Sequence, residues 1–281
     1  MKFEKWQALG NDYLIVEADR LPWELTAKRV EWLCDPHFGV GADGVLLLSR
    51  SDDPEFVAEL RIFNPDGSEA ELSGNGAREA ILFLRRHGWT DAEEFAIKTV
   101  AGPIRPTITG ELTCSVDMGA ASTASKDFPS GGEDGRGTLS SGGREWEFQH
   151  VSIGNPQCAI VVGEEIEDLD LDAIGPEIEG NELFPNRTNV SFLAIDGSRV
   201  RARIFERGVG ETLSSGTGAS GAAITAFLRG SASPIVVELD GGELEVEIGE
   251  DLAVRLNGWA EPVYAGELAP ELVKALADAD E

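Results

Sequence analysis

The amino-acid sequence predicts a mixed α/β (α+β) fold made of two pseudo-symmetric domains that arose by internal duplication. Three observations lead to this expectation: the length of the chain, a motif that occurs twice in the same order, and strand patterns that outnumber helix patterns. The chain has 281 residues, which exceeds a typical single domain of about 100–150 residues. Two domains of similar size are therefore expected.

The duplication is visible as one stretch of sequence written twice. Arg61-Ile62-Phe63 recurs as Arg203-Ile204-Phe205, and Ser73-Gly74-Asn75-Gly76-Ala77 recurs as Ser215-Gly216-Thr217-Gly218-Ala219. Both recurrences are 142 residues apart, so the register holds without a gap. Two copies at so long a period indicate a duplicated domain, because solenoid repeats are shorter and more numerous.

Local patterns give both copies the same order of elements. Residues 60–63 and 200–205 alternate apolar and polar side chains, as half-buried strands do. A turn-rich loop follows each strand, and behind it comes a helix with one apolar face: Ala77, Ala80, Ile81 and Leu84 in the first copy, Ala219, Ala222, Ala223 and Ala226 in the second. A fainter echo lies earlier, where Gly10-Asn11 and Gly154-Asn155 each precede an apolar run. Further strand candidates are residues 96–99, 191–195, 235–239, 244–248 and 252–256.

The boundary between the halves is expected near residue 118. Residues 120–143 are rich in Ser, Gly and Asp and have little apolar periodicity, which predicts an exposed connection. The N-terminal half then covers residues 1–118 and the C-terminal half covers residues 119–261. The segment 262–281 is expected to pack on the N-terminal half.

Charge and composition exclude several classes of partner. The formal net charge of −28 at pH 7 would repel nucleic acids and anionic membrane surfaces. No apolar run reaches the roughly 18 residues of a membrane span, and the first residues lack a signal-peptide pattern. The three cysteines and three histidines lack the short paired spacing of a metal site or disulfide framework. We therefore expect a cytoplasmic protein with no metal, nucleic-acid or membrane partner.

Each copy of the repeated loop places a serine directly before Gly-x-Gly and the start of a helix. The first backbone N–H groups of a helix are free and partly positive, so a carboxylate is expected to bind there. One interpretation is that Ser73 and Ser215 are only helix N-caps, a position that serine favours. Their occurrence as a symmetric pair favours a second interpretation, in which both contact a shared anionic ligand.

In this order, the motifs resemble those of the diaminopimelate epimerases, within the wider group of proline racemase-like enzymes. The resemblance spans nearly the whole chain and rests on residues 9–13, 39–44, 61–69, 74–78, 154–156 and 206–212. It implies two domains that are each a β-barrel-like sheet around a central helix, with the active site in the interdomain cleft. It also implies a homodimer that acts on a small amino acid without a cofactor. The implied reaction is epimerisation of LL-diaminopimelate to meso-diaminopimelate, a step of lysine biosynthesis.

The resemblance implies site residues as well. Ser73 and Ser215 stand at the two catalytic positions, and the substrate-contacting positions are Asn11, Asn64, Gly74, Asn75, Asn155, Asn189, Glu206, Arg207, Gly216 and Thr217. The asparagines could instead be ordinary turn residues, which Asn favours. Glu206 and Arg207 could be a surface ion pair of little energetic weight.

The sequence departs from the family pattern at the catalytic positions. The family transfers protons with two cysteines, whereas a serine hydroxyl is a weaker base than a thiol of unperturbed pKa about 8.5. Gln157 stands where the family usually has a histidine, which leaves Glu206 as the candidate to activate a serine. Ser220 and Glu79 also replace common cysteines, which favours a natural variant over a targeted exchange. Two alternatives stay open: an active serine epimerase, and a catalytically silent or altered-specificity amino-acid-binding homologue.

Overall fold

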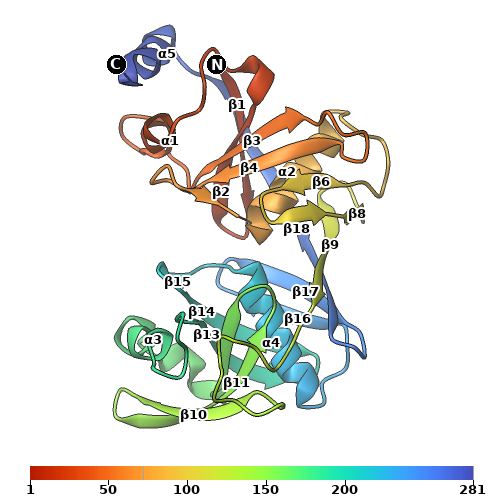
Figure 1. Ribbon diagram of the computed structural model, residues 1–281, viewed down its shortest axis with the longest axis vertical. Helices are drawn as coiled ribbons and strands as arrows, with labels where there is room; N and C mark the ends of the chain where they lie inside the picture. Colours follow the sequence, from red (N-terminus) through yellow and green to blue (C-terminus); the bar gives the residue numbers. More distant parts are fainter. Residues whose placement is uncertain (72, 281) are drawn as a thin grey trace. The chain divides into compact units, whose positions relative to one another are not determined.

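The computed structural model describes residues 1–71 and 73–280, and the chain forms two compact units (Figure 1). The first unit is Met1–Val116 together with Trp259–Glu281, and the second is Asp117–Gly258. Both chain ends belong to the first unit, so the second unit is one continuous stretch. Glu281, which ends the segment 262–281, lies outside the described residues. Within residues 1–71 and 73–280, no helix is both long enough and apolar enough to cross a membrane.

Most strands of the first unit belong to an eight-stranded mixed sheet. Its order is β19-β1-β2-β3-β4-β6-β7, with the short β5 paired to β4. The strands are β1 Lys2–Ala8, β2 Asn11–Glu17, β3 Val45–Arg50, β4 Ala58–Phe63, β5 Glu69–Ala70, β6 Ile97–Thr99, β7 Gly102–Ile104 and β19 Glu261–Glu267. The pairs β2·β3 and β4·β6 are parallel, while β3·β4 and β4·β5 are antiparallel.

The second sheet has eleven strands and repeats the pattern of parallel and antiparallel pairings seen in the first. Its order is β10-β11-β12-β13-β14-β16-β17-β18-β9-β8, with β15 paired to β14. The strands are β8 Pro106–Ile108, β9 Thr113–Ala120, β10 Arg136–Ser141, β11 Arg144–Ser152, β12 Pro156–Val161, β13 Asn189–Asp196, β14 Arg199–Glu206, β15 Gly210–Thr212, β16 Ile235–Leu239, β17 Gly242–Ile248 and β18 Ala253–Trp259. Here β12·β13 and β14·β16 are parallel, and β13·β14 and β14·β15 are antiparallel. The predicted α+β fold with two pseudo-symmetric halves is confirmed.

One long helix lies at the centre of each unit. In the first unit α2 (Gly74–Arg86) packs on β1, β2 and β3, and in the second α4 (Gly216–Leu228) contacts β11 to β14, β16 and β17. The predicted apolar face of α4, made by Ala219, Ala222, Ala223 and Ala226, is fully buried. A helix of small apolar residues on every side is expected to be enclosed, as this one is. The remaining helices are α1 Ala27–Cys34, α3 Leu171–Glu179, α5 Pro270–Ala277 and the short 3₁₀ turns η1 Ala18–Arg20, η2 Gly163–Asp168 and η3 Asp278–Asp280.

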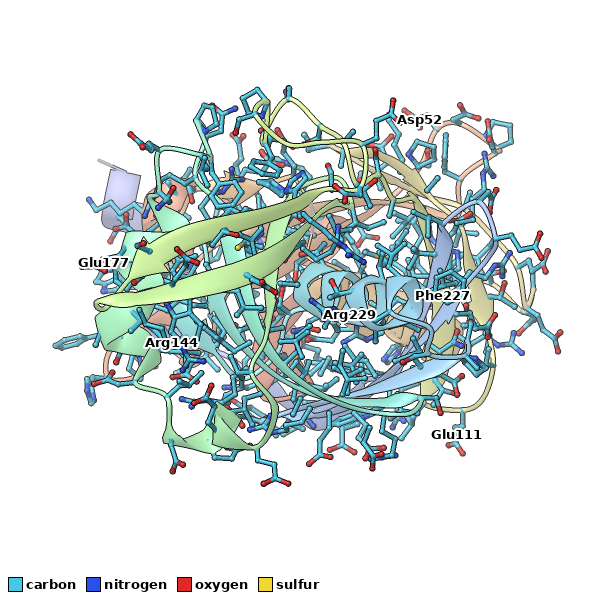
Figure 2. All side chains as sticks on the ribbon, turned by 90° about the horizontal axis from the view of Figure 1, so that it is seen from below. Asp52, Glu111, Arg144, Glu177, Phe227 and Arg229 are labelled. Atoms are coloured by element: carbon cyan, nitrogen blue, oxygen red, sulfur yellow. The ribbon has the colours of Figure 1, made fainter. Side chains whose placement is uncertain are left out.

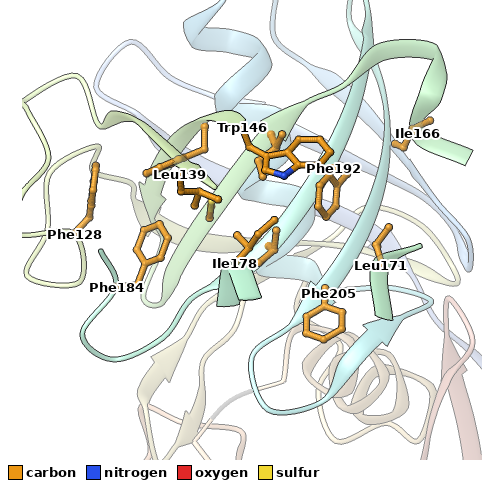
Figure 3. Packing of buried hydrophobic residues seen from close by; sticks show 13 residues of the cluster. Phe128, Leu139, Trp146, Ile166, Leu171, Ile178, Phe184, Phe192 and Phe205 are labelled. Carbon is orange, nitrogen blue, oxygen red and sulfur yellow. The ribbon is translucent and has the colours of Figure 1, made fainter. Parts of the chain in front are cut away.

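The core of the second unit corrects one expectation from the sequence. Residues 120–143 are not simply an exposed connection, because they include the edge strand β10 and bury Phe128 and Leu139, each 5% exposed (Figure 3). Both side chains pack in a cluster with Trp146 and Phe148. The strand is hard to recognise because its outward face is polar and Gly137 interrupts it. That glycine is required by packing, since a Cβ there would lie 2.4 Å from Cζ of Phe148.

The C-terminal segment packs on the first unit through main-chain acceptors. The buried Arg29 side chain of α1 donates from Nε to the carbonyl of Leu276 at 2.8 Å and from Nη2 to that of Ala277 at 3.2 Å. These carbonyls lie at the end of α5, where a cation also offsets the negative end of the helix dipole.

The acidic residues of the chain lie mostly on the outside. Figure 2 shows the labelled carboxylates of Asp52, Glu111 and Glu177 at the periphery of the molecule, and all three residues are exposed. The high negative charge is thus carried by solvated side chains, which have little influence on the fold itself.

Glu79 is a buried exception on α2. The side chain is fully buried, and neither carboxylate oxygen has a hydrogen-bond partner among the described residues. Burial raises the pKa of Glu79 well above its usual range, and the charge of Arg78 offsets only part of this effect. The folded protein therefore favours the neutral carboxylic acid.

Replacing Glu79 by glutamine should stabilise the protein in a pH-dependent way. A carboxyl whose pKa is raised by folding supports stability below its unfolded pKa of about 4.3, and this support is lost as pH rises. We expect Glu79→Gln to raise the free energy of unfolding by about 1–3 kcal/mol at pH 8 and by much less at pH 5. Urea unfolding at both pH values measures this, with the exposed Glu111→Gln as control. A gain that does not depend on pH would contradict the assignment.

Candidate active site

The two repeated serines cap the two central helices. Ser73 Oγ accepts a hydrogen bond from the Gly76 N–H at 3.1 Å, and Ser215 Oγ accepts one from the Gly218 N–H at 3.2 Å. Both serines have extended backbone dihedrals, as N-cap residues do. Both serines are therefore helix N-caps, and this position places each hydroxyl at the positive end of a buried helix.

The second glycine of each loop is explained by packing. A Cβ on Gly76 would lie 3.0 Å from Leu46 Cδ2, and a Cβ on Gly218 would lie 2.5 Å from Ile204 Cδ1. The missing side chain thus lets each helix start lie directly against its sheet. This close packing sets the distance between the capping serine and the strands beneath the helix.

In the second unit, Ser215 is hydrogen-bonded to a carboxylate. Its Oγ donates to Glu206 Oε2 at 3.0 Å, and Thr212 Oγ1 donates to Glu206 Oε1 at 2.9 Å. Ser215 is only 5% exposed, and Glu206 is half-buried at the end of β14. Burial raises the pKa of Glu206, while the two hydroxyl donors partly offset that rise. The carboxyl is thereby a better proton acceptor than an ordinary glutamate.

Two further candidates of the second unit lie beside the same loop. Asn155 Nδ2 donates to Thr217 Oγ1 at 3.2 Å, and Gln157 Nε2 donates to Asn155 Oδ1 at 2.7 Å. Gln157 thus orients an asparagine next to the start of α4. An amide cannot exchange protons as an acid or base, so its role here is positional.

Asn189 and Arg207 are joined to the backbone around the site. The buried amide of Asn189 donates to the carbonyl of Pro156 at 3.1 Å and accepts from the Arg207 N–H at 2.9 Å. Arg207 is exposed, and its Nη1 donates to the carbonyl of Asn186 at 2.9 Å. Glu206 and Arg207 therefore have separate partners, and both ends of the Asn189 amide are used within the protein.

In the first unit, Ser73 is hydrogen-bonded to a phenol. Tyr13 Oη donates to Ser73 Oγ at 3.2 Å. Nearby, Asn75 Nδ2 donates to Asn11 Oδ1 at 3.3 Å, and Asn11 Nδ2 donates in turn to Asp43 Oδ2 at 2.9 Å. Asn11 and Asn75 thus lie together with the first serine loop.

Arg78 supports this group from within the helix. Its fully buried guanidinium donates from Nη2 to Asn75 Oδ1 at 2.6 Å and from Nη1 to the carbonyl of Gly74 at 3.2 Å. The side-chain oxygen of Asn75 is therefore occupied, which leaves its NH₂ group as the donor that reaches Asn11.

Asn64 lies apart from these contacts in a tight turn after β4. Its N–H donates to the carbonyl of Ser68 at 2.8 Å, and its Nδ2 donates to Ser68 Oγ at 2.9 Å. Among the described residues, the structure gives it no hydrogen bond to another candidate. Of the other candidates, the first unit contains Asn11, Ser73, Gly74 and Asn75, and the second contains Asn155, Asn189, Glu206, Arg207, Ser215, Gly216 and Thr217.

Sequence reasoning missed the hydroxyls of Tyr13 and Thr212. Tyr13 belongs to the motif Leu9-Gly10-Asn11-Asp12-Tyr13 and follows Gly-Asn at the same spacing as Gln157 in the second half. That shared spacing is the signal that could have drawn attention to it. Thr212 carries no such signal, because its contact depends on the β14–β15 hairpin.

Sulfur and metal chemistry find little support in the described residues. Cys34, Cys114 and Cys158 are all buried, and burial raises the pKa of Cys34 and of Cys114 to about 12. Burial also raises the pKa of Cys158. These thiols are therefore poor sources of a thiolate. Across residues 1–71 and 73–280, no three His, Cys, Asp or Glu side chains gather as metal ligands would.

Comparison with known proteins relates the chain to one family. The family model described as diaminopimelate epimerase matches residues 3–124 and 149–258. A diaminopimelate epimerase 2 of Nostoc sp. is 39% identical over 283 residues, covering 97% of both chains. A diaminopimelate epimerase of Azoarcus sp. is 39% identical over 273 residues, covering 95% of this chain and 98% of the relative.

Solved structures share the fold at lower identity. A phenazine biosynthesis protein of the PhzF family from Bacillus anthracis has a TM-score of 0.66 at 20% identity, covering 96% of this chain and 99% of the other. A hydroxyproline epimerase from Agrobacterium vitis, with bound trans-4-hydroxy-L-proline, has a TM-score of 0.65 at 17% identity, covering 95% and 90%.

Replacing Ser215 by alanine should cost more stability than replacing Ser73. Each change removes a helix cap, which costs about 1 kcal/mol. Ser73→Ala also removes the acceptor of the buried Tyr13 hydroxyl, a neutral hydrogen bond of about 0.5–1.5 kcal/mol, whereas Ser215→Ala removes a donor to the Glu206 carboxylate, a hydrogen bond to a charged group of about 1.5–3 kcal/mol. Urea unfolding at pH 8 measures both. In a Glu206→Leu background, which has no acceptor for the Ser215 hydroxyl, the extra cost of Ser215→Ala should disappear, and its persistence would show that Glu206 does not depend on Ser215.

Proposed function

The chain belongs to the diaminopimelate epimerase family and is an isomerase, and from this premise we propose that it converts LL-diaminopimelate to meso-diaminopimelate with Ser73 and Ser215 as the proton-transferring groups. The observation that carries the proposal is the hydrogen bond from Ser215 Oγ to Glu206 Oε2 at 3.0 Å. A serine paired with a carboxylate of raised pKa has the base that a lone hydroxyl lacks.

The α-carboxylate of the substrate would bind at the helix starts. Gly74 and Asn75 begin α2, and Gly216 and Thr217 begin α4, so their N–H groups lie at positive helix ends. The same N–H groups would stabilise the negative charge that spreads onto the carboxylate when the α-proton leaves. Asn11, Asn64, Asn155, Asn189 and Arg207 are proposed to contact the polar groups of the substrate.

Proton transfer at the second serine can be written with every atom in balance. The α-C–H bond breaks and its electron pair remains on the substrate as an enolate. The proton passes to Ser215 Oγ while the hydroxyl proton moves to Glu206, so the serine ends neutral and the carboxyl ends protonated. The opposite face of the carbanion receives its proton from Ser73.

The same proposal includes the assembly and location that the resemblance implies, namely a homodimer in the cytoplasm that needs no cofactor. Size-exclusion chromatography with light scattering tests the assembly.

The alternative function, an amino-acid-binding homologue without turnover or with altered specificity, is favoured by one observation. Gln157, which cannot transfer a proton, stands beside the site.

Proton exchange in deuterated water separates the two functions. With LL-diaminopimelate as substrate, we expect incorporation of deuterium at the α-carbon together with formation of the meso isomer. Ser73→Ala and Ser215→Ala should each lower the rate by about 100-fold or more, because each removes a proton-transferring group. The exposed Ser140→Ala in β10 serves as the matched serine control.

A lack of exchange above background in the unmodified protein would contradict the epimerase proposal. If calorimetry still detected binding of the amino acid, the binding-protein function would replace it. A Ser73→Cys, Ser215→Cys double variant should exceed the activity of the unmodified protein, because a thiol, with an unperturbed pKa of about 8.5, forms its conjugate base near neutral pH far more readily than a hydroxyl does.

A further inference from the structure

The phenol of Tyr13 occupies a position for which the proposed reaction has a use. Tyr13 lies in β2, is 5% exposed, and donates from Oη to Ser73 Oγ at 3.2 Å. Building on the proposed function, we propose that Tyr13 is a proton-relay residue that acts through Ser73. On this view Tyr13 returns a proton to the serine oxygen after the serine has protonated the substrate.

Two glycines fix the orientation of the Tyr13 ring. A Cβ on Gly44 would lie 2.6 Å from Tyr13 Cε1, and a Cβ on Gly76 would lie 3.3 Å from Tyr13 Cε2. The ring therefore fits against both glycines with its hydroxyl toward the helix start. Such a fit leaves the hydroxyl little freedom to turn away from Ser73.

The internal repeat shows that each serine has a different partner. Glu206, which accepts from Ser215, follows Arg203-Ile204-Phe205, and the residue that follows Arg61-Ile62-Phe63 is Asn64. The amide of Asn64 is used in the turn with Ser68. Ser73 thus lacks the carboxylate that its counterpart has.

At the repeat position of Tyr13, it is the first half that has a group able to exchange a proton and the second half that lacks one. Its counterpart two residues after Gly-Asn in the second half is Gln157, which lies against Gly221, where a Cβ would be 2.9 Å from Gln157 Cγ. Each half therefore supplies its serine with one group that can exchange a proton, from different repeat positions. The second half supplies a carboxylate, and the first half supplies a phenol.

The relay step balances in protons and electrons. The carbanion pair forms a new C–H bond with the proton of Ser73, and the Oγ–H bond breaks and leaves its pair on Oγ. Tyr13 then gives its hydroxyl proton to Oγ along the hydrogen bond and becomes a phenolate. Solvent water reprotonates the phenolate, and Glu206 loses to water the proton that it gained. In the reverse direction every transfer is reversed.

Tyr13→Phe removes only the hydroxyl and tests the relay. We expect kcat for diaminopimelate epimerisation to fall about 100-fold, while KM changes little, because the lost group acts in the chemical step. The chain has only one other tyrosine, Tyr264. It lies 43% exposed on β19, so Tyr264→Phe is the matched control and should retain activity.

The same Tyr13→Phe change made in a second protein background distinguishes loss of a proton relay from a packing defect. In a Ser73→Cys protein, the more acidic thiol can give up its proton without help from a phenol. Adding Tyr13→Phe there should lower kcat by less than about 3-fold. A packing defect would instead lower kcat equally in both backgrounds and would lower the melting temperature, and this result would overturn the relay.

The remaining outcomes distinguish the relay from the proposed function. If the unmodified protein epimerises the substrate and Tyr13→Phe leaves kcat unchanged, the relay is wrong and the proposed function stands. If the unmodified protein shows no α-proton exchange at all, both are wrong. A rise in KM with constant kcat would assign Tyr13 to substrate binding and would also overturn the relay.

Discussion

A helix that begins inside a sheet-covered unit must have its first backbone N–H groups satisfied where little water is present. In both units a serine Oγ meets this need at the third residue of the helix. The rest of the site follows from this one hydrogen bond. It fixes the serine at the positive end of α2 or α4, next to strand residues that can reach its oxygen. The structural role and the proposed chemical role of the serines therefore depend on the same geometry and do not compete.

Duplication has preserved this backbone arrangement while the chemistry around it has diverged. The parallel and antiparallel pairings that surround α2 and α4 correspond strand by strand. The groups that contact the two serines do not correspond, since one is a carboxylate and the other a phenol. Main-chain geometry is set by burial and register, which the two halves share. The side chain that contacts each serine comes from a different strand in each half, β2 for Tyr13 and β14 for Glu206.

Much of this site could be predicted from the sequence because the repeat is written in local patterns. The register of the two copies placed Ser73 and Ser215 at equivalent helix starts, and apolar spacing indicated the buried face of α4. The partner of Ser73 could not be predicted in this way, because Tyr13 is 60 residues away in the chain and its approach requires β2 to lie beside α2. The strand β10 was not predicted from the sequence, for a different reason. Its inward residues alternate with polar and glycine residues that also typify loops, and only tertiary packing of Leu139 distinguishes the two.

The division of the chain into units has a consequence for the order in which the molecule can form. The second unit is continuous, and the chain enters it along β9 and leaves it along β18, which are neighbours in one sheet. The first unit is interrupted, since β1 pairs with β19 and Arg29 binds carbonyls of the last helix. During synthesis from the N-terminus, the second unit is complete while β1 still lacks one of its two neighbours. The first unit, whose synthesis begins first, is therefore the unit whose fold is completed last.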